Sequence, residues 1–326
     1  MSQEKNGLNG DWIWTLRKRK HKYAPRFANA LCPKIKAMTL LCHFLNGEHI
    51  LPWWIAHHKT IFDHAVLVDH GSTDRSVEII QEMAPSWEIV STQTLDFGAN
   101  IVDDEMMEIE KRFDGPKIVL NVTEFLFGED IRASIEDSQS QGYDGIVTRG
   151  AIMVDPNVGS ETYPDELLPL VWSLPYGQFE DTLREHMPLV PLRSRVLHWQ
   201  ETGEYWPGRH SSRLQNLQHR KDVMTLWFHY SPLNPTSING HSTYFSRYPS
   251  GYANWLKSTY NHFATDEDYD RAMLDGYHHL SPPYHFLRHF LMLRRVSMNL
   301  KSDDHFGRAF ERWYGSKWFE VLSKEC

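Results

Sequence analysis

The chain has few cysteines: three in 326 residues, at Cys32, Cys42 and Cys326. Their number is odd and their spacing fits no common metal site, which argues against a disulfide framework and against a cysteine-based metal centre. We therefore expect buried or free thiols in a reducing compartment.

Long apolar runs are also missing. No stretch approaches the roughly 20 apolar residues that a membrane-spanning helix needs. Residues 1–22 are polar and basic, without the apolar centre of a secretory signal. These two features predict a cytoplasmic protein.

Positive charge is in deficit, since the formal net charge is -8. This balance excludes a general nucleic-acid binder. The exception is the basic run Arg17–Lys22, which follows Trp12 and Trp14. Two interpretations stay open: a solvated basic arm, or peripheral contact with an anionic membrane surface.

Hydrophobic residues make up 41% of the chain, enough for a substantial core. We expect a basic extension over residues 1–36, a main domain over 37–250 and a C-terminal helical segment over 251–326. From Ala37 to Thr148, apolar strands alternate with amphipathic helices, which predicts an α/β fold with a mostly parallel sheet flanked by helices. After Gly150, recurring Pro, Gly, Trp and Tyr predict long loops around shorter strands.

The strongest local signal lies in residues 67–76, where an apolar strand runs into an acidic, glycine-containing turn before a helix. Ligands of open α/β sheets bind beyond the carboxyl ends of strands, and a carboxylate there accepts hydrogen bonds from a ribose or a base. Alternatively, Asp69 and Asp74 shape the turn and cap the helix. The polar residues expected at this edge are Asn46, Glu48, Asp69, Ser72 and Asp74.

Three segments together carry a resemblance: Asn46–His58, Phe62–His64 and Asp69–Asp74. Their series Leu-Pro…Trp…His…Asp…Ser-Thr-Asp resembles the opening of glycosyltransferase family 2 and its relatives, over about Ala37 to Phe127. The resemblance implies a Rossmann-like GT-A fold, a nucleotide-sugar donor and a glycan or glycolipid acceptor. It also implies that Asp69 approaches the nucleoside and that Asn46, Glu48, Ser72 and Asp74 help to bind the donor.

The segment Ile118–Leu126 departs from that family. Family members carry Asp-x-Asp-Glu-Phe-Leu there, and the aspartates bind a divalent cation, manganese or magnesium, that bridges the donor diphosphate. Here Asn121 and Thr123 replace both aspartates, and Glu124 remains. Three outcomes stay open: Glu124 holds a metal with help from the donor, cationic side chains replace the metal, or the chain binds nucleotide or carbohydrate without transfer.

Arg209 and Arg213 are the candidates for such cationic replacement, because guanidinium groups match phosphate oxygens. A polar loop with ordinary surface arginines is the alternative. In family relatives a histidine after a late strand often completes the metal or phosphate site, and His229 has that position. A histidine beside aromatic residues also serves purely structural purposes.

An inverting transfer needs a general base. Glu180 and Asp181 resemble the Glu-Asp motif of family 2, in which a carboxylate has this role, and Asp181 is the first candidate. The same residues open a predicted helix, where acids also stabilise the helix dipole. The expected function is therefore an inverting sugar transfer from a nucleotide sugar, with Asp181 or Glu180 as the base.

Overall fold

The computed structural model describes residues 36–94, 99–155, 168–186, 193–232 and 293–315. The basic run at 17–22, Trp12 and Trp14 before it, and most of the segment 251–326 lie outside these ranges. Within them, no helix combines the length and the apolar character needed to cross a membrane.

The described elements alternate along the chain as the sequence predicts for its first half. The strands are β1 (Thr39–Phe44), β2 (His64–Asp69), β3 (Glu88–Ser91), β4 (Lys117–Asn121), β5 (Glu124–Gly128), β6 (Gly145–Val154), β7 (Tyr176–Phe179), β8 (Val196–His198), β9 (Leu217–Tyr230) and β10 (Met298–Asn299). The helices are α2 (Leu51–His58), α3 (Ser76–Met83), α4 (Ala99–Glu110), α5 (Ile131–Ser140), α6 (Leu170–Ser173), α7 (Glu180–His186), the short 3₁₀ turn η1 (Leu300–Ser302) and α12 (Asp304–Tyr314).

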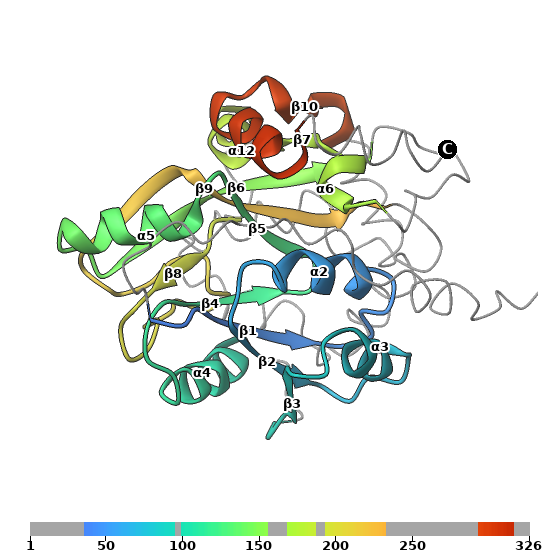
Figure 1. Ribbon diagram of the computed structural model, residues 1–326, viewed down its shortest axis with the longest axis vertical. Coiled ribbons are helices and arrows are strands. Elements are labelled where there is room, and N and C mark those ends of the chain that lie inside the picture. Colours follow the sequence, from blue (N-terminus) through green and yellow to red (C-terminus); the bar gives the residue numbers. More distant parts are fainter. Residues whose placement is uncertain (1–35, 95–98, 156–167, 187–192, 233–292, 316–326) are drawn as a thin grey trace, which may run out of the picture.

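Four strands form a parallel block in the order β3-β2-β1-β4 (Figure 1). The chain runs outward from β1 through β2 to β3, then returns to the other side of β1 to form β4. The strand order therefore reverses between β1 and β4, which is the topological switch point where open α/β sheets bind ligands. The predicted mostly parallel sheet flanked by helices is confirmed.

The other half of the sheet is mixed and is organised around β6. The 14-residue β9 runs parallel to β6 along one side and pairs antiparallel with β5. Strands β7 and β8 pair antiparallel with β6. The expectation of only short strands after Gly150 is wrong for β9, because its first half, Gln218–Asp222, is polar and does not show the alternation of a half-buried strand.

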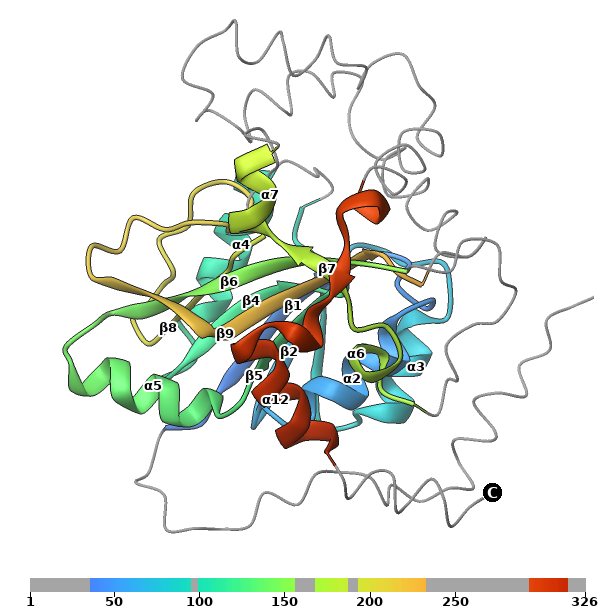
Figure 2. The same cartoon turned by 90° about the horizontal axis from the view of Figure 1, so that it is seen from above.

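Helices cover both faces of the sheet (Figure 2). Helices α2, α5 and α12 pack on one face, where Leu40, Cys42 and Phe44 belong to the larger buried cluster. Helix α4 covers the opposite face, where its Met106 packs with Leu41 of β1. Successive strand residues point to opposite faces, so His43 of β1 lies on the face of Leu41 and α4.

Two histidines fasten α2 to β5. The Nε2 of His57 donates to the carbonyl of Leu126 over 2.7 Å, and its ring stacks on Trp313 of α12 with centroids 4.7 Å apart. The Nε2 of His58 accepts from the Leu126 amide over 3.2 Å, so its Nδ1 carries the proton donated to the Trp54 carbonyl. Both rings are buried and neutral, and burial lowers the pKa of His57 to about 4.

The described part of the C-terminal segment packs on the main sheet. Strand β10 pairs with β7, and α12 packs against β5 and β9. Asp303 caps α12 by accepting hydrogen bonds from the amides of His305 and Phe306, each over 3.0 Å. The domain boundaries at 36 and 250 stay a prediction.

Because His57 is neutral in the folded protein, we expect the free energy of unfolding to decrease in mild acid. Its folded pKa lies below the unfolded value of about 6.5, so the unfolded chain binds more protons between pH 6.5 and 4, and stability is lost as pH falls through this range. This residue alone accounts for a loss of about 2 kcal/mol between pH 7 and pH 5. Urea unfolding at both values, compared with His57→Gln, checks this. An equal pH dependence in the variant would contradict it.

Candidate functional site

The switch point brings one side chain from each of its two strands together. His43 of β1 and Asn121 of β4 are register partners near the carboxyl ends of their strands. Val119, two residues before Asn121, packs with Leu41 in the cluster under α4, so Asn121 shares the α4 face with His43. This pair therefore lies at the carboxyl edge of the sheet, on the α4 side.

The loops after β1 and β2 bind each other at this edge. Asn46, with φ of 52°, donates its amide to the Ser72 hydroxyl over 3.1 Å and accepts from the Thr73 amide over 2.8 Å. The Glu48 amide donates to Asp74 over 3.0 Å. The structure thus brings the predicted edge residues together, and their hydrogen bonds hold the two loops in place.

Asp69 belongs to the same arrangement. Its Oδ1 accepts from the Ser72 amide over 2.9 Å, and the residue is half-buried. Asp74 accepts from the Ser76 amide over 3.0 Å at the start of α3. The turn-shaping interpretation of Asp69 and Asp74 accounts for these contacts. Ser72 and Thr73 are both tied to the turn, and α3 begins at Ser76.

A loop between β8 and β9 reaches this edge from the α4 side. We call residues Gly203–Ser212 the arginine loop. A bridge between Tyr205 and Ser212 closes it, and its tip contains Gly208 at φ 90° and Arg209 at φ 60°. A positive φ is costly for an arginine and is maintained only where surrounding contacts enforce it. Arg209 is 4% exposed, so the loop carries a guanidinium group into the protein.

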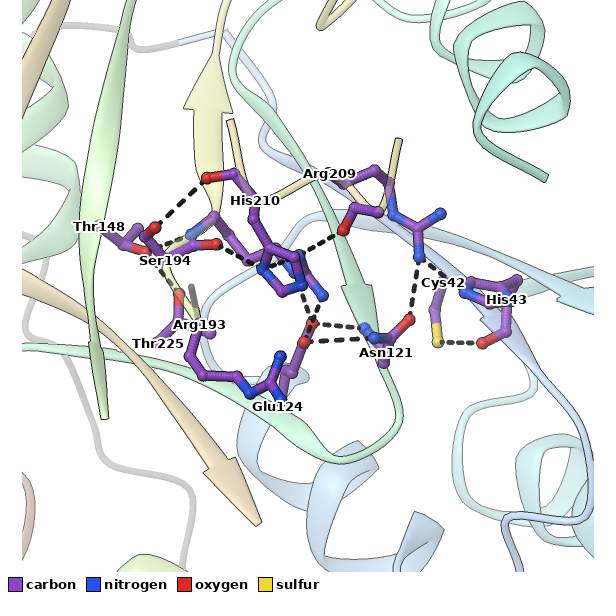
Figure 3. A network of polar contacts seen from close by, with 12 residues as sticks. Cys42, His43, Asn121, Glu124, Thr148, Arg193, Ser194, Arg209, His210 and Thr225 are labelled. Atoms are coloured by element: carbon purple, nitrogen blue, oxygen red, sulfur yellow. Dashed lines mark hydrogen bonds and ion pairs between the residues drawn. The ribbon is translucent and has the colours of Figure 1, made fainter. Parts of the chain in front are cut away.

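Arg209 contacts three elements at the switch point, and Figure 3 shows its hydrogen bonds with Asn121 and His43. It forms a buried ion pair with Asp103 of α4. Its Nη2 donates to Asn121 Oδ1 over 3.0 Å and to His43 Nε2 over 2.7 Å. Burial and the neighbouring guanidinium hold the pKa of His43 well below its usual value, so His43 is a neutral acceptor.

A second buried arginine lies beside the first. Arg195 binds Glu124 through two parallel hydrogen bonds, one of them 2.8 Å from Nε to Oε2, and both side chains are at most 2% exposed. Asn121 also donates to Glu124, from its amide over 2.8 Å and from Nδ2 over 3.2 Å. Arg195 Nη1 reaches the Gly208 carbonyl and His210 Nδ1, each at 2.7 Å. Asn121 thus links both arginine centres.

Helix α4 holds the arginine loop at two points. Asp103 accepts from the Gly208 amide over 2.7 Å, and two turns later Glu110 accepts from the Gly203 amide over 2.7 Å and from the Tyr205 hydroxyl over 2.6 Å. Both carboxylates are buried. Burial raises the pKa of Asp103, against the opposing attraction of Arg209.

The two candidate bases point to different neighbours. Glu180 accepts from the amides of Arg193 and Ser194, over 2.5 and 3.1 Å, and so adjoins the segment that carries Arg195. A Cβ at Gly150 would lie 2.6 Å from Glu180 Oε2, so this approach requires glycine. Asp181 pairs instead with Arg149 over 3.0 Å, and Arg149 also binds the α12 cap Asp303.

The remaining predicted residues are spread around the site. Thr123 is buried, and its carbonyl accepts from the Phe228 amide over 2.7 Å. The ring of His229 stacks on Trp227 with centroids 4.3 Å apart. Arg213 is exposed, and its guanidinium lies over the Trp206 ring at 4.5 Å. The structure thus places Arg209 at the switch point and Arg213 on the surface.

Sequence reasoning missed His43, Asp103, Arg195 and His210. A signal existed for Asp103 and Glu110, because both lie on the α4 face that carries Val102 and Met106, and a carboxylate on an apolar face needs a buried partner. The sequence around Arg195 carries no comparable signal.

No protein-family model and no curated protein matches the sequence. Among solved structures, S. aureus TarS is similar to this chain at 9% identity and a TM-score of 0.37, over 71% of this chain and 44% of TarS. Residues 1–349 of TarS match at 10% identity and a TM-score of 0.34, over 88% and 83% of the two chains. Glucosyl-3-phosphoglycerate synthase from Mycobacterium tuberculosis, in complex with Mn²⁺, UDP-glucose and phosphoglyceric acid, matches at 14% and 0.36, over 66% and 82%. Likenesses of this strength do not assign an activity to the chain.

The Asp103–Arg209 pair predicts a large stability effect. Asp103→Asn leaves the Arg209 guanidinium buried without its counter-charge, which we expect to lower the free energy of unfolding by about 3 kcal/mol or more. Asp104→Asn, at the exposed neighbouring position of α4, is the matched control and should change it by less than about 0.5 kcal/mol. Denaturant unfolding measures both. Equal stability of the two variants would show that the pair is not a buried, paired charge.

Proposed function

We propose that the protein is a glycosyltransferase of the hexosyltransferase type that transfers a sugar from a nucleotide-sugar donor. The single observation that carries this proposal is the convergence of Arg209, Arg195 and Asn121 at the topological switch point of the sheet. A guanidinium group held near the carboxyl edge of parallel strands suits a phosphate-bearing ligand.

The strand order and the sequence resemblance support the same proposal independently. The order β3-β2-β1-β4 is that of a nucleotide-binding half-fold. The series from Asn46 to Asp74 resembles glycosyltransferase family 2, and its loops frame one side of this edge. We therefore assign a GT-A fold to residues 37–250, with Asp69 beside the nucleoside.

The chemistry is a displacement at the anomeric carbon. An acceptor hydroxyl oxygen attacks that carbon, the bond from carbon to the diphosphate oxygen breaks, and the electron pair leaves with the nucleotide. Positive charge near the diphosphate stabilises the departing anion, and a carboxylate takes the hydroxyl proton. This single displacement inverts the configuration.

Glu180 and Asp181 are the candidates for the base. Glu180 adjoins the Arg193–Arg195 segment, whereas Asp181 pairs with Arg149 on the α12 side. The contacts therefore favour Glu180, with Asp181 as the second candidate. We propose a glycan or glycolipid acceptor and a cytoplasmic location, with membrane contact through the basic run at 17–22.

A second candidate function is nucleotide or carbohydrate binding without transfer. One observation favours it: the carboxylates of both Glu124 and Asp181 are ion-paired with arginines. The fold and the ligand class would be the same in this case, and only turnover separates the two functions.

Release of a free nucleoside diphosphate tests the proposal. Incubation with UDP- and GDP-linked hexoses and a mixed glycan acceptor should release nucleotide, measured by a coupled assay. Glu180→Gln should slow release by about 100-fold or more if Glu180 is the base, while Asp181→Asn should keep most of the rate. The reverse ranking would assign the base to Asp181, and binding without release would favour the second candidate.

A further inference from the structure

We propose that the diphosphate end of this site works without a divalent cation, because Glu124, Asn121 and Asp103 are already bound to the guanidinium groups of Arg195 and Arg209. This inference rests on the proposed function, since it concerns how the same donor is held. It is argued from the chemistry of Asn121, Thr123 and Glu124, which lie at the positions of the metal motif in the family that the sequence resembles.

Glu124 does not fit a metal ligand. Its two oxygens accept four hydrogen bonds, from Nε and Nη2 of Arg195 and from the amide and Nδ2 of Asn121. A carboxylate offers about four lone-pair sites, so all of them are in use. A cation at Glu124 would have to displace a bidentate, fully buried arginine.

Asn121 does not fit either. Its side-chain oxygen accepts from Arg209 Nη2 over 3.0 Å, so this oxygen already binds a positive group. Thr123 brings no charge. The two carboxylates of the network, Glu124 and Asp103, are each neutralised by an arginine. Hard divalent cations require anionic oxygens, and this donor set leaves none for them.

Several contacts hold each of the two arginines in place. Arg209 is held by Asp103, Asn121 and His43, and it keeps a positive φ that only such contacts maintain. Arg195 is held by Glu124, His210 and the Gly208 carbonyl. Each guanidinium therefore stays paired with its carboxylate, and neither Glu124 nor Asp103 is released to bind a cation.

The histidines of the network agree with this charge pattern. His43 and His210 both face arginines, and burial together with those guanidinium groups keeps both rings neutral. Neutral rings accept hydrogen bonds from the arginines and hold them in position. Across the described residues, no three His, Cys, Asp or Glu side chains come together in a metal-binding arrangement.

Calorimetric titration of the full chain with UDP and with GDP tests the inference. In EDTA and in millimolar Mn²⁺, the dissociation constant of the preferred nucleotide should agree within about twofold. Titration with Mn²⁺ alone, followed by the electron paramagnetic resonance of the free ion, should show no saturable site. Nucleotide binding that requires Mn²⁺ would overturn the inference and leave the proposed transfer standing. Absence of UDP and GDP binding in both buffers would contradict the proposed function and, with it, this inference.

Variants of the ion pair give a second readout. Arg209→Met leaves Asp103 buried alone and risks unfolding, so the informative variant is the double change Arg209→Met with Asp103→Asn, which removes both charges together. In EDTA it should bind nucleotide at least about tenfold more weakly than the wild type. Arg112→Met, which removes a surface arginine paired with Glu88, is the control and should bind as the wild type does. Unchanged affinity in the double variant, with a normal unfolding transition, would overturn the role of Arg209.

Discussion

The buried pairing of two arginines with two carboxylates is the constraint on which the site depends. A charge inside a protein is costly unless a partner and further hydrogen bonds compensate for it. Arg209 can lie at the switch point only because Asp103 of α4 pairs with it there. Arg195 can be buried only because Glu124 accepts hydrogen bonds from its Nε and Nη2. The positions of α4, β5 and the arginine loop are therefore coupled to one another.

The arginine loop contains no helix or strand of its own, and contacts with its neighbours hold it in place. Glu110 holds the start of the loop at Gly203 and Asp103 holds its tip at Gly208, and Arg195 binds the Gly208 carbonyl. The strained conformation at Arg209 is compensated by these contacts.

Four buried histidines in the described part of the chain act as neutral hydrogen-bonding groups. His57 and His58 connect α2 to β5, while His43 and His210 hold the arginines. In each case burial lowers the pKa, so the ring keeps one donor and one acceptor at neutral pH. The loops after β1 and β2 form the remaining wall of the site through reciprocal hydrogen bonds.

The sequence by itself determined the parallel half of the fold and the edge of the sheet at which we expect a ligand to bind. Local patterns carry this information: apolar runs at β1, β2 and β4, amphipathic helices between them, and the turn Asp69–Asp74 after a strand. Only the tertiary structure decided which charges meet. Arg209 and Asp103 are 106 residues apart, and Arg195 and Glu124 are 71 apart. The position of Asp103 on the apolar face of α4 indicates a buried partner, but no local pattern identifies that partner. Arg209 lies in a loop, where an arginine is expected to be solvated until the packing of the sheet buries it. The long strand β9 was missed for a related reason, since its polar half is recognised as a strand only by its pairing with β6.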